Sequence, residues 1–193
     1  MFVRLSTARW LQAGINALRV SRLRLHGASV GTGTRVESEV FARRAWRGGR
    51  AGRIAIGRNC SLETGVVLEA FGGGIELGRN VFLGPYSVIY GHGGVTIGDS
   101  CLIAMHCRIL SSSHGVPQFG TDIQSQPDVL MPTRLGRDVW LGAGVTILGG
   151  VAVGDGCVIG AGSVVTKDVP PGAIAVGSPA EIKGFREGHP PPS

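Results

Sequence analysis

The sequence predicts an all-β fold in which short parallel strands wind into a helix with a repeat of six residues. Aliphatic residues recur every six positions along most of the chain, whereas an amphipathic α-helix would repeat every three or four and a half-buried strand every two. A small residue usually follows each of them four positions later. The composition agrees, because 33 glycines and only 6% aromatic residues suit many tight turns around a core of small side chains.

Three repeats, about 18 residues, would close one triangular rung, and rungs stacked about 4.8 Å apart would bury their aliphatic residues in columns. A chain of 193 residues is expected to form one such domain. The aliphatic positions expected to point inward are Val30, Val36, Ile56, Leu62, Leu68, Leu77, Leu83, Ile89, Ile97, Ile103, Ile109, Leu135, Leu141, Ile147, Val153, Ile159 and Val165. The small inward residues are Thr34, Val40, Cys60, Val66, Val81, Ser87, Cys101, Cys107, Ser113, Val139, Val145, Val151, Cys157, Ser163 and Val169, with Gly72 and Gly93 in the two remaining places.

The register of six divides the chain into three parts. Residues 1–29 are expected to form a basic amphipathic helical segment, residues 30–178 the β-helix, and residues 179–193 a C-terminal tail. The longest break in the register separates Ile109 from Leu135 by 26 positions where six are expected. We interpret residues 115–134 as an inserted loop, and a long loop on a rigid repeat structure is usually functional.

His114 stands at the root of this loop. It follows Ser113, which the register places inward, so alternation predicts that the imidazole projects outward beneath the loop. Imidazole is suited to general-base chemistry, because its unperturbed pKa of about 6.5 leaves a neutral base at neutral pH. The simplest alternative is an exposed loop histidine without a chemical role.

Two smaller breaks also interrupt the register. The segment Phe71-Gly-Gly-Gly74 adds three residues, and the segment around Tyr90-Gly-His-Gly-Gly94 adds two. Because the second break lies one rung before His114, Tyr86, Tyr90 and His92 are candidates to line an acceptor cleft. The alternative is that all three are exposed residues at bulged corners.

The four cysteines all occupy the small inward position of the repeat. A buried thiol in an apolar column has a raised pKa and reacts poorly, and the spacings match no zinc ribbon. We therefore interpret the cysteines as core residues, neither nucleophiles nor metal ligands: Cys60, Cys101, Cys107 and Cys157.

The segment "DVWLGAGVTILGGVAVGDGCVIGAGSVVTKDVPPGAIAVGSPAEIK" at 138–183 resembles the hexapeptide-repeat acyltransferases. The resemblance covers about residues 30–183 and is strongest to galactoside and maltose acetyltransferases and related sugar O-acetyltransferases of bacterial surface polysaccharides. It implies a left-handed parallel β-helix, a homotrimer, and an acetyltransferase that moves the acetyl group of acetyl-CoA directly to a carbohydrate hydroxyl without a metal.

The resemblance also implies roles for single residues. His114 would be the general base, although relatives often carry Asp or Asn before it where serines stand here, so its orienting partner is Asp122, Asp128 or a backbone carbonyl. A backbone N–H at or beside Ala143 would stabilise the oxyanion. The remaining cofactor-binding candidates fall into three groups. The bare wall for the pantetheine arm would consist of Gly142, Ala143, Gly160, Ala161 and Gly162, and Trp140 would lie near the thiol. The polar candidates toward the nucleotide end are Thr166, Lys167, Ser178 and Lys183.

Two other functions stay open at this point. One is a zinc hydratase similar to the gamma-class carbonic anhydrases, in which His92, His106 and His114 would bind the metal. The other is a non-catalytic β-helix that serves as a binding or scaffold protein. The hydratase should lose activity to chelators, and the scaffold should lack a CoA site.

The basic residues concentrate at the N-terminal end. Residues 1–60 contain twelve arginines and two acidic residues, a balance of +10. We expect a cytoplasmic protein, because no apolar stretch reaches the roughly 18 residues of a membrane span and arginines interrupt any signal-like segment. The basic segment either caps the open end of the β-helix or contacts an anionic membrane at its inner face. Nucleic acid is not expected as a partner, since no nucleic-acid-binding fold accompanies the charge.

Overall fold

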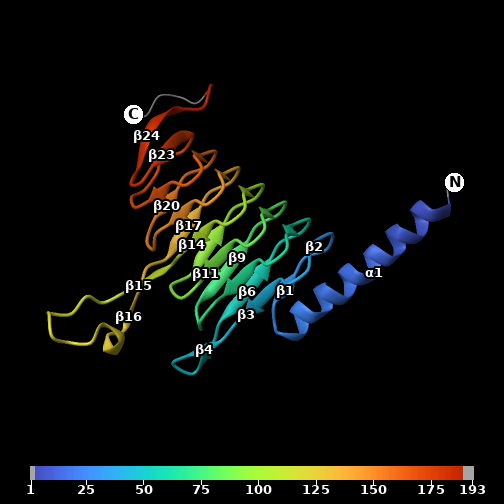
Figure 1. Cartoon of the computed structure of the whole chain (residues 1–193), viewed down its shortest axis with the longest axis horizontal. Helices are drawn as coiled ribbons and strands as arrows, with labels where there is room; N and C mark the ends of the chain where they lie inside the picture. The colour runs from blue at the N-terminus through green and yellow to red at the C-terminus, as the bar shows by residue number, and fades with distance from the viewer. Residues whose placement is uncertain (1–2, 189–193) are drawn as a thin grey trace.

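The structure, a computed structural model, describes residues 3–188, and most of them form a triangular β-helix with an α-helix at its N-terminal end (Figure 1). Three sheets form the sides, and the chain visits sheet A, sheet B and sheet C in that order in each rung. This arrangement confirms the predicted all-β, left-handed parallel β-helix.

Each sheet takes one short strand from each rung. Sheet A contains β1 (Ser29–Val30), β6 (Arg53–Ile56), β9 (Gly74–Leu77), β12 (Val95–Ile97), β17 (Thr133–Leu135) and β20 (Ala152–Val153). Sheet B contains β2 (Arg35–Val36), β7 (Ser61–Leu62), β10 (Phe82–Leu83), β13 (Leu102–Ile103), β18 (Trp140–Leu141), β21 (Val158–Ile159), β23 (Ala173–Gly177) and β24 (Ala180–Phe185). Sheet C contains β3 (Phe41–Arg43), β8 (Val67–Glu69), β11 (Val88–Tyr90), β14 (Arg108–Ile109), β19 (Thr146–Ile147) and β22 (Val164–Val165).

The aliphatic positions of successive rungs lie directly above one another. Leu77, for example, pairs with Ile56 in the rung before and with Ile97 in the rung after. Every aliphatic position that the repeat of six placed inward is buried. This part of the sequence prediction is therefore confirmed, and the core consists of stacked columns of aliphatic side chains.

The small inward position was wrong at three places, all of them beside a break in the register, while Val40 is half-buried but packs against the core. Ser113 is exposed, and Gly72 and Gly93 are only half-buried. The buried residues at these places stand two positions earlier in the chain: Ala70, Gly91 and Ser111. The chain leaves the β-helix directly after these three residues, so the six-residue count does not apply beyond them.

The cysteines lie in the core, as expected, and their thiols also donate hydrogen bonds. Burial raises the pKa of all four thiols, that of Cys101 to about 11. Each thiol lies 3.0–3.2 Å from a carbonyl oxygen of the next rung, in the pairs Cys60–Gly78, Cys101–Gly136, Cys107–Gly142 and Cys157–Pro170. Thr34 and Ser87 make the same kind of bond through their hydroxyls. At these six places the small residue is also a hydrogen-bond donor, whereas valine stands at most of the other places.

Helix α1 (Val3–Leu25) covers the N-terminal end of the β-helix with its C-terminal half. Leu23 is buried, and Asn16 bonds the open strand edge, where its Nδ2 donates to the Thr34 carbonyl (3.1 Å) and its Oδ1 accepts from the Val36 N–H (2.8 Å). These contacts are those of a cap, one of the two roles expected for this segment. The N-terminal half of α1 points away from the β-helix (Figure 1). No helix in the described part of the chain combines the length and the apolar character that a membrane span requires.

Two hairpins leave the β-helix at the corner between sheets C and A, which we name the C–A corner. The first pairs β4 (Trp46–Arg47) with β5 (Arg50–Ala51), and the second pairs β15 (Ser112–His114) with β16 (Asp128–Leu130). The second hairpin is the expected inserted loop, and a 3₁₀ turn at Ile123–Ser125 lies near its tip. At the other end, part of the expected tail forms β24, which pairs antiparallel with β23.

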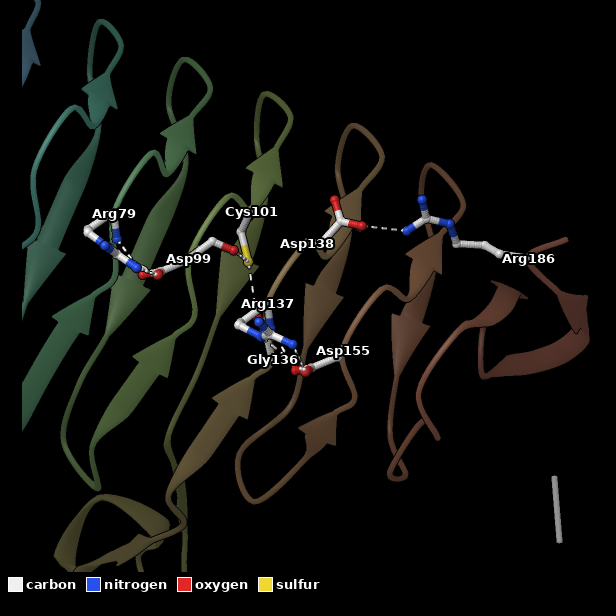
Figure 2. Close-up of polar contacts among 8 residues, drawn as sticks. All are labelled: Arg79, Asp99, Cys101, Gly136, Arg137, Asp138, Asp155 and Arg186. Carbon is white, nitrogen blue, oxygen red and sulfur yellow. Dashed lines mark hydrogen bonds and ion pairs between the residues drawn. The ribbon is translucent and has the colours of Figure 1, made fainter. Parts of the chain in front are cut away.

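The corner between sheets A and B, the A–B corner, is a ladder of paired charges (Figure 2). Three ion pairs follow one another along it, with N–O distances of 2.7, 3.3 and 2.7 Å: Arg79–Asp99, Arg137–Asp155 and Arg186–Asp138. A groove of about 730 Å³ runs along this corner, but the arginines and aspartates of its walls are paired with one another. We therefore assign the ladder to the stacking of rungs and not to a ligand.

Candidate active site

His114 lies on the exposed strand β15, at the stem of the inserted hairpin. The register of the hairpin sets it opposite Asp128, and His114 Nδ1 lies 3.4 Å from Asp128 Oδ1. The His114 side chain is 62% exposed, as expected from the sequence, whereas Asp128 is 28% exposed. Asp122, the other carboxylate considered as its partner, precedes the 3₁₀ turn near the tip. Of the two carboxylates, Asp128 is therefore the one in contact with the imidazole.

An aromatic cluster lies at the same corner. The Phe71 ring stacks on His92 with centroids 3.9 Å apart, and it meets Tyr90 edge to face at 5.1 Å. Tyr90 and His92 were both candidates for the acceptor cleft, and the structure brings them together. Phe71 was not predicted as a site residue, although it stands in a break of the register, the signal that drew attention to the other two.

The surroundings of His92 lower its pKa. Burial is the main cause, and Arg47 and His114 lower the pKa further, against the raising effects of Asp128 and Glu69. His92 Nδ1 is buried and has no hydrogen-bond partner among the residues described. The His92 ring thus lies at the C–A corner, close enough to His114 and Asp128 for both residues to affect its pKa.

Tyr86, the third candidate for the acceptor cleft, lies elsewhere. It belongs to the corner between sheets B and C, the B–C corner, where its ring stacks on His106 with centroids 5.5 Å apart. The three histidines considered as zinc ligands are thus divided between two corners, and within residues 3–188 no cluster of three or more His, Cys, Asp or Glu could hold a metal. Within one chain, therefore, these three histidines do not come together as a set of zinc ligands.

The B–C corner is lined by small uncharged residues in its last two rungs. A Cβ on Gly142 would come within 2.6 Å of the Ala161 backbone nitrogen, and one on Gly160 within 2.5 Å of Val176 Cγ1. These two glycines are therefore required by the packing of neighbouring rungs. Gly162 has a φ of 70° and nothing within 4 Å of its missing Cβ, and Ala161 is exposed. The open part of the expected bare wall thus consists of Ala161 and Gly162, with Ala143 in the rung before.

The Ala143 backbone N–H is free among the described residues. Its position in the rung corresponds to that of Arg79 and Arg137 at the A–B corner, where aspartate Oδ1 atoms accept these N–H groups at 2.7 and 2.8 Å. No hydrogen bond from the Ala143 N–H occurs within the described part of the chain. A free N–H in this position can bind an oxyanion.

The other donor-site candidates lie near this corner or at the C-terminal end. Trp140 on β18 is half-exposed on the outer face of sheet B. Thr166 and Lys167 are exposed directly after β22, and within the described residues Lys167 forms no ion pair. Ser178 is exposed in the turn between β23 and β24, and Lys183 is already paired with Glu181 at 2.7 Å. Of the two lysines, Lys167 has the freer ammonium group.

His114 and Ala143 belong to different corners of one chain. The hairpin that carries His114 leaves the C–A corner, whereas Ala143 lies at the B–C corner, and sheet C separates the two. The base and the bare wall therefore do not face each other within a single subunit.

The chain matches two families of hexapeptide repeats. Residues 132–167 match the bacterial transferase hexapeptide (six repeats), and residues 49–70 and 74–107 match the hexapeptide repeat of succinyl-transferase. These matches cover rungs on both sides of the inserted hairpin.

The relatives include named acetyltransferases. The chain is 36% identical to the galactoside O-acetyltransferase of Escherichia coli K12, over 66% of this chain and 61% of the relative. It is also 36% identical to WbbJ of the same strain, named for O-acetyl transfer in lipopolysaccharide biosynthesis, over 68% of this chain and 71% of the relative. A solved galactoside acetyltransferase in complex with coenzyme A has a TM-score of 0.58 and 29% identity, and it covers 80% of this chain and 65% of that chain. The chain spans 45–61% of the length of the first curated relatives that it matches.

Proposed function

This chain belongs to the hexapeptide-repeat acetyltransferase family, and from that premise we propose that it transfers an acetyl group from acetyl-CoA to a carbohydrate hydroxyl. The observation that carries the proposal is the exposed His114 with a carboxylate at its Nδ1. A carboxylate in that position favours the Nδ1–H tautomer, which leaves Nε2 as the base.

The reaction requires one proton transfer and one acyl transfer. As Nε2 of His114 takes the proton of the acceptor hydroxyl, the hydroxyl oxygen forms a bond to the thioester carbon. The carbonyl oxygen becomes an oxyanion, which the free N–H of Ala143 is suited to stabilise. The carbon–sulfur bond then breaks, the thiolate of CoA takes up the proton from the imidazolium, and the acetyl ester is released. The proposed transfer is direct, and an acyl-cysteine has no place in it, because all four thiols are buried in the core.

We assign the donor groove to the B–C corner. The bare surface at Ala143, Ala161 and Gly162 gives the pantetheine arm room to lie along the backbone. Trp140 would flank its thiol end. Lys167 lies after β22, at the C–A corner of the last rung, and within the described residues its ammonium group forms no ion pair. It is suited to hold a phosphate at the nucleotide end from a neighbouring subunit. Thr166 and Ser178 are secondary candidates, and Lys183 is a weaker one because its ammonium group is paired with Glu181.

Two observations support a homotrimer. The first is that the base and the donor groove lie at different corners, so a neighbouring subunit must bring them together. The second is an apolar column on the outer face of sheet B, where Leu102 and Trp140 pair in register and are 46% and 49% exposed. Its members are Phe82, Leu102, Trp140, Val158 and Ile174. A column of this kind is typical of a surface that another protein covers, and the corresponding column of sheet A contains Glu76 and Arg134.

The acceptor class is a carbohydrate, either a small saccharide or a precursor of a surface polysaccharide. The relatives named for galactoside and lipopolysaccharide O-acetyl transfer support this class. Tyr90 and His92 beside His114 are candidates to contact the sugar, and Tyr86 could take part only across a subunit contact, since it lies at another corner.

Calorimetric titration with CoA tests the assignment of the donor groove. Ala161→Trp should fill the bare surface and abolish measurable CoA binding while the protein stays folded, because residue 161 is exposed. Arg58→Trp, at the equivalent exposed position of the A–B corner, is the matched control and should bind CoA like the wild type. Equal CoA affinity in the two variants would contradict the groove.

We further propose that α1 contacts an anionic membrane, so that the enzyme works at the cytoplasmic face. The helix contains five arginines and no acidic residue. Arg22 and Arg24 are exposed near its end, whereas Arg19 is half-buried and pairs with Glu37 at 3.1 Å. The large apolar residues Trp10, Leu11, Leu18 and Leu25 are also exposed on it. An exposed combination of arginines and large apolar residues suits the interface of anionic lipids. A second copy of α1 fits less well, since the arginines of two helices would repel each other.

Cosedimentation with vesicles tests the membrane contact. Phosphatidylglycerol vesicles should pellet the protein at low salt and release it as salt rises, because exposed charges are screened within about 8–10 Å at 0.1–0.15 M. Arg22→Gln with Leu18→Ser should weaken binding, whereas Arg134→Gln on sheet A should not. Equal pelleting with neutral and anionic vesicles would remove the proposal.

A further inference from the structure

The small hairpin β4–β5 delivers one charged side chain to the active-site corner. Arg47 on β4 reaches across to the inserted hairpin, where its Nη2 lies 3.4 Å from Asp128 Oδ2. The other oxygen of the same carboxylate faces His114 Nδ1, also at 3.4 Å. Each oxygen of Asp128 therefore has one partner, and an unbroken series of contacts leads from Arg47 to the imidazole.

The local backbone is shaped to let Arg47 pass. A Cβ on Gly72 would come within 2.3 Å of Arg47 Cβ and 2.7 Å of its backbone nitrogen, and Gly72 has a φ of 79°, so another residue there would be strained as well as crowded. The glycine-rich break after β8 thus accommodates Arg47 of the hairpin β4–β5. The glycine-rich break and the hairpin β4–β5 are separate in the sequence, but together they allow Arg47 to reach Asp128.

The environment of Arg47 differs from that of an ordinary surface arginine. Its Nη1 is buried and lacks a hydrogen-bond partner among the described residues, as does Nδ1 of the neighbouring His92. Arg50, directly across the hairpin, is exposed and forms no ion pair within the described part of the chain. A buried polar atom without a partner is unfavourable, so the fold retains Arg47 in a position that stability alone does not favour.

We propose that Arg47 is a positioning residue for the acetyl transfer: it fixes the rotation of the Asp128 carboxylate, which in turn holds the His114 ring with Nε2 toward the acceptor. This inference rests on the proposed function. The distances of 3.4 Å are longer than good hydrogen bonds, and such contacts often tighten when substrates bind. Because β15 and β16 stand away from the rigid β-helix, an external anchor is needed to keep the base in one orientation, and Arg47 supplies it from a separate hairpin.

Steady-state kinetics of four variants tests this role, with acetyl-CoA and a verified carbohydrate acceptor. Arg47→Ala should lower kcat about ten-fold, the lower end of the effect of removing an outer partner from a functional histidine in metal sites, and leave the KM for acetyl-CoA unchanged. Arg50→Ala, the matched control across the hairpin, should match the wild type. The double variant Arg47→Ala with Asp128→Asn should be no slower than Asp128→Asn alone, because the two residues act in series. Guanidinium at millimolar concentration should restore part of the lost kcat in Arg47→Ala but not in Asp128→Asn.

A second readout needs no acceptor. Nitrogen-15 spectra of the histidine rings in the full-length protein, with the His114 signals identified by loss in His114→Gln, report which ring nitrogen carries the proton. Arg47→Ala should shift His114 from the Nδ1–H form toward a mixture of the two tautomers, and Arg50→Ala should not.

Three outcomes separate this inference from the proposed function. If Arg47→Ala matched Arg50→Ala in kcat and in the tautomer of His114 while His114→Ala was inactive, the positioning role would be wrong and the proposed function would stand. If the double variant lost kcat by the product of the two single losses, Arg47 and Asp128 would act independently, and the positioning role would again be wrong. If His114→Ala kept full turnover, the proposed function itself would fail. Thermal melting of each variant identifies one that has failed to fold, and the tautomer measurement on Arg47→Lys then replaces it.

Discussion

The A–B and B–C corners have the same backbone repeat but very different surfaces. At the A–B corner, arginines and aspartates of successive rungs pair with one another, and aspartate Oδ1 atoms accept the backbone N–H groups of Arg79 and Arg137. At the B–C corner the corresponding residues in the last two rungs are Ala143 and Ala161, and the N–H of Ala143 is free among the described residues.

From this comparison we infer that one repeat is divided between stability and chemistry. The backbone of the rung positions an N–H at each corner, and the side chain of the next rung decides whether that N–H is satisfied internally or left for a ligand. Aspartates close the A–B corner, whereas small residues leave the B–C corner open. Substitutions at the first should change stability, and substitutions at the second or at the hairpins of the C–A corner should change catalysis.

The largest effect is expected at the C–A corner. His114→Ala should lower turnover about 10²–10⁴-fold, the usual contribution of a positioned general base, and leave the affinity for CoA nearly unchanged. His26→Ala, an exposed histidine at the end of α1, is the control and should keep full turnover. Full turnover in His114→Ala with a verified acceptor would remove the C–A corner from the chemistry.

The donor end should respond in binding and not in chemistry. Lys167→Ala should weaken CoA binding about ten-fold, as expected for one charge-assisted contact to phosphate, with a smaller change in kcat at saturating acetyl-CoA. Lys183→Ala should have less effect, because that ammonium group is paired with Glu181. If Lys183→Ala weakened CoA binding more than Lys167→Ala in a calorimetric titration, the nucleotide end of CoA would have to be assigned to β24.

Substitution of the buried thiols that donate hydrogen bonds to the next rung should affect stability alone. Cys101→Ala leaves the Gly136 carbonyl without its partner and should lower the free energy of unfolding by about 1–3 kcal/mol, whereas Cys101→Ser keeps a donor and should lose less. Denaturant unfolding measures both values. A loss of activity in either variant beyond that of the folded fraction would place the thiol in the chemistry.

The thiol of Cys101 also predicts a dependence of stability on pH. Its pKa is about 11 in the folded protein against an ordinary 9.0, so the folded state holds this proton more tightly than the unfolded chain. Its contribution is therefore complete below about pH 9 and declines as pH rises toward 11. Cys101→Ala should show a shallower decline in chemical denaturation over this range, and an identical decline would contradict the burial of the thiol.

The smallest effect is expected at the A–B corner. Arg79→Ala and Asp99→Ala should lower the melting temperature only slightly, because exposed ion pairs contribute little, and kcat should not change. The Arg79 backbone N–H and guanidinium lower the pKa of Asp99. The stabilisation is therefore present above the ordinary range of an aspartate pKa and is lost as pH falls through the lowered value. A large fall in kcat for either variant would contradict the division between the corners.

The sequence predicted the β-helix well because its signal is periodic. Each aliphatic position is buried for the same reason, the stacking of identical rungs, so one register accounts for the whole core. The count failed at Ser113, Gly72 and Gly93, since residues that leave the β-helix no longer follow its period. Residues 179–193 were named only as a C-terminal tail, and the period of six could not predict that β24 pairs antiparallel with β23.

In the candidate site, the donor residues were predicted from the resemblance, and the residues of the C–A corner were predicted because they stand beside a break in the period. That signal identified His114, Tyr90 and His92, and it could also have identified Phe71. It could not choose between Asp122 and Asp128, because the choice depends on the register of β15 with β16. It could not identify Arg47 as a partner of Asp128 either, since that contact joins two hairpins 81 positions apart in the chain.

Co-expression of two inactive variants tests the central claim, that each active site combines the C–A corner of one subunit with the B–C corner of another. His114→Ala removes the base and Ala161→Trp fills the donor groove. In randomly mixed trimers, about one subunit contact in four pairs a native base with a native groove. The account therefore predicts about a quarter of wild-type activity from the mixture and almost none from either variant alone. Mixed trimers that are detected by native mass spectrometry and yet remain inactive would contradict it.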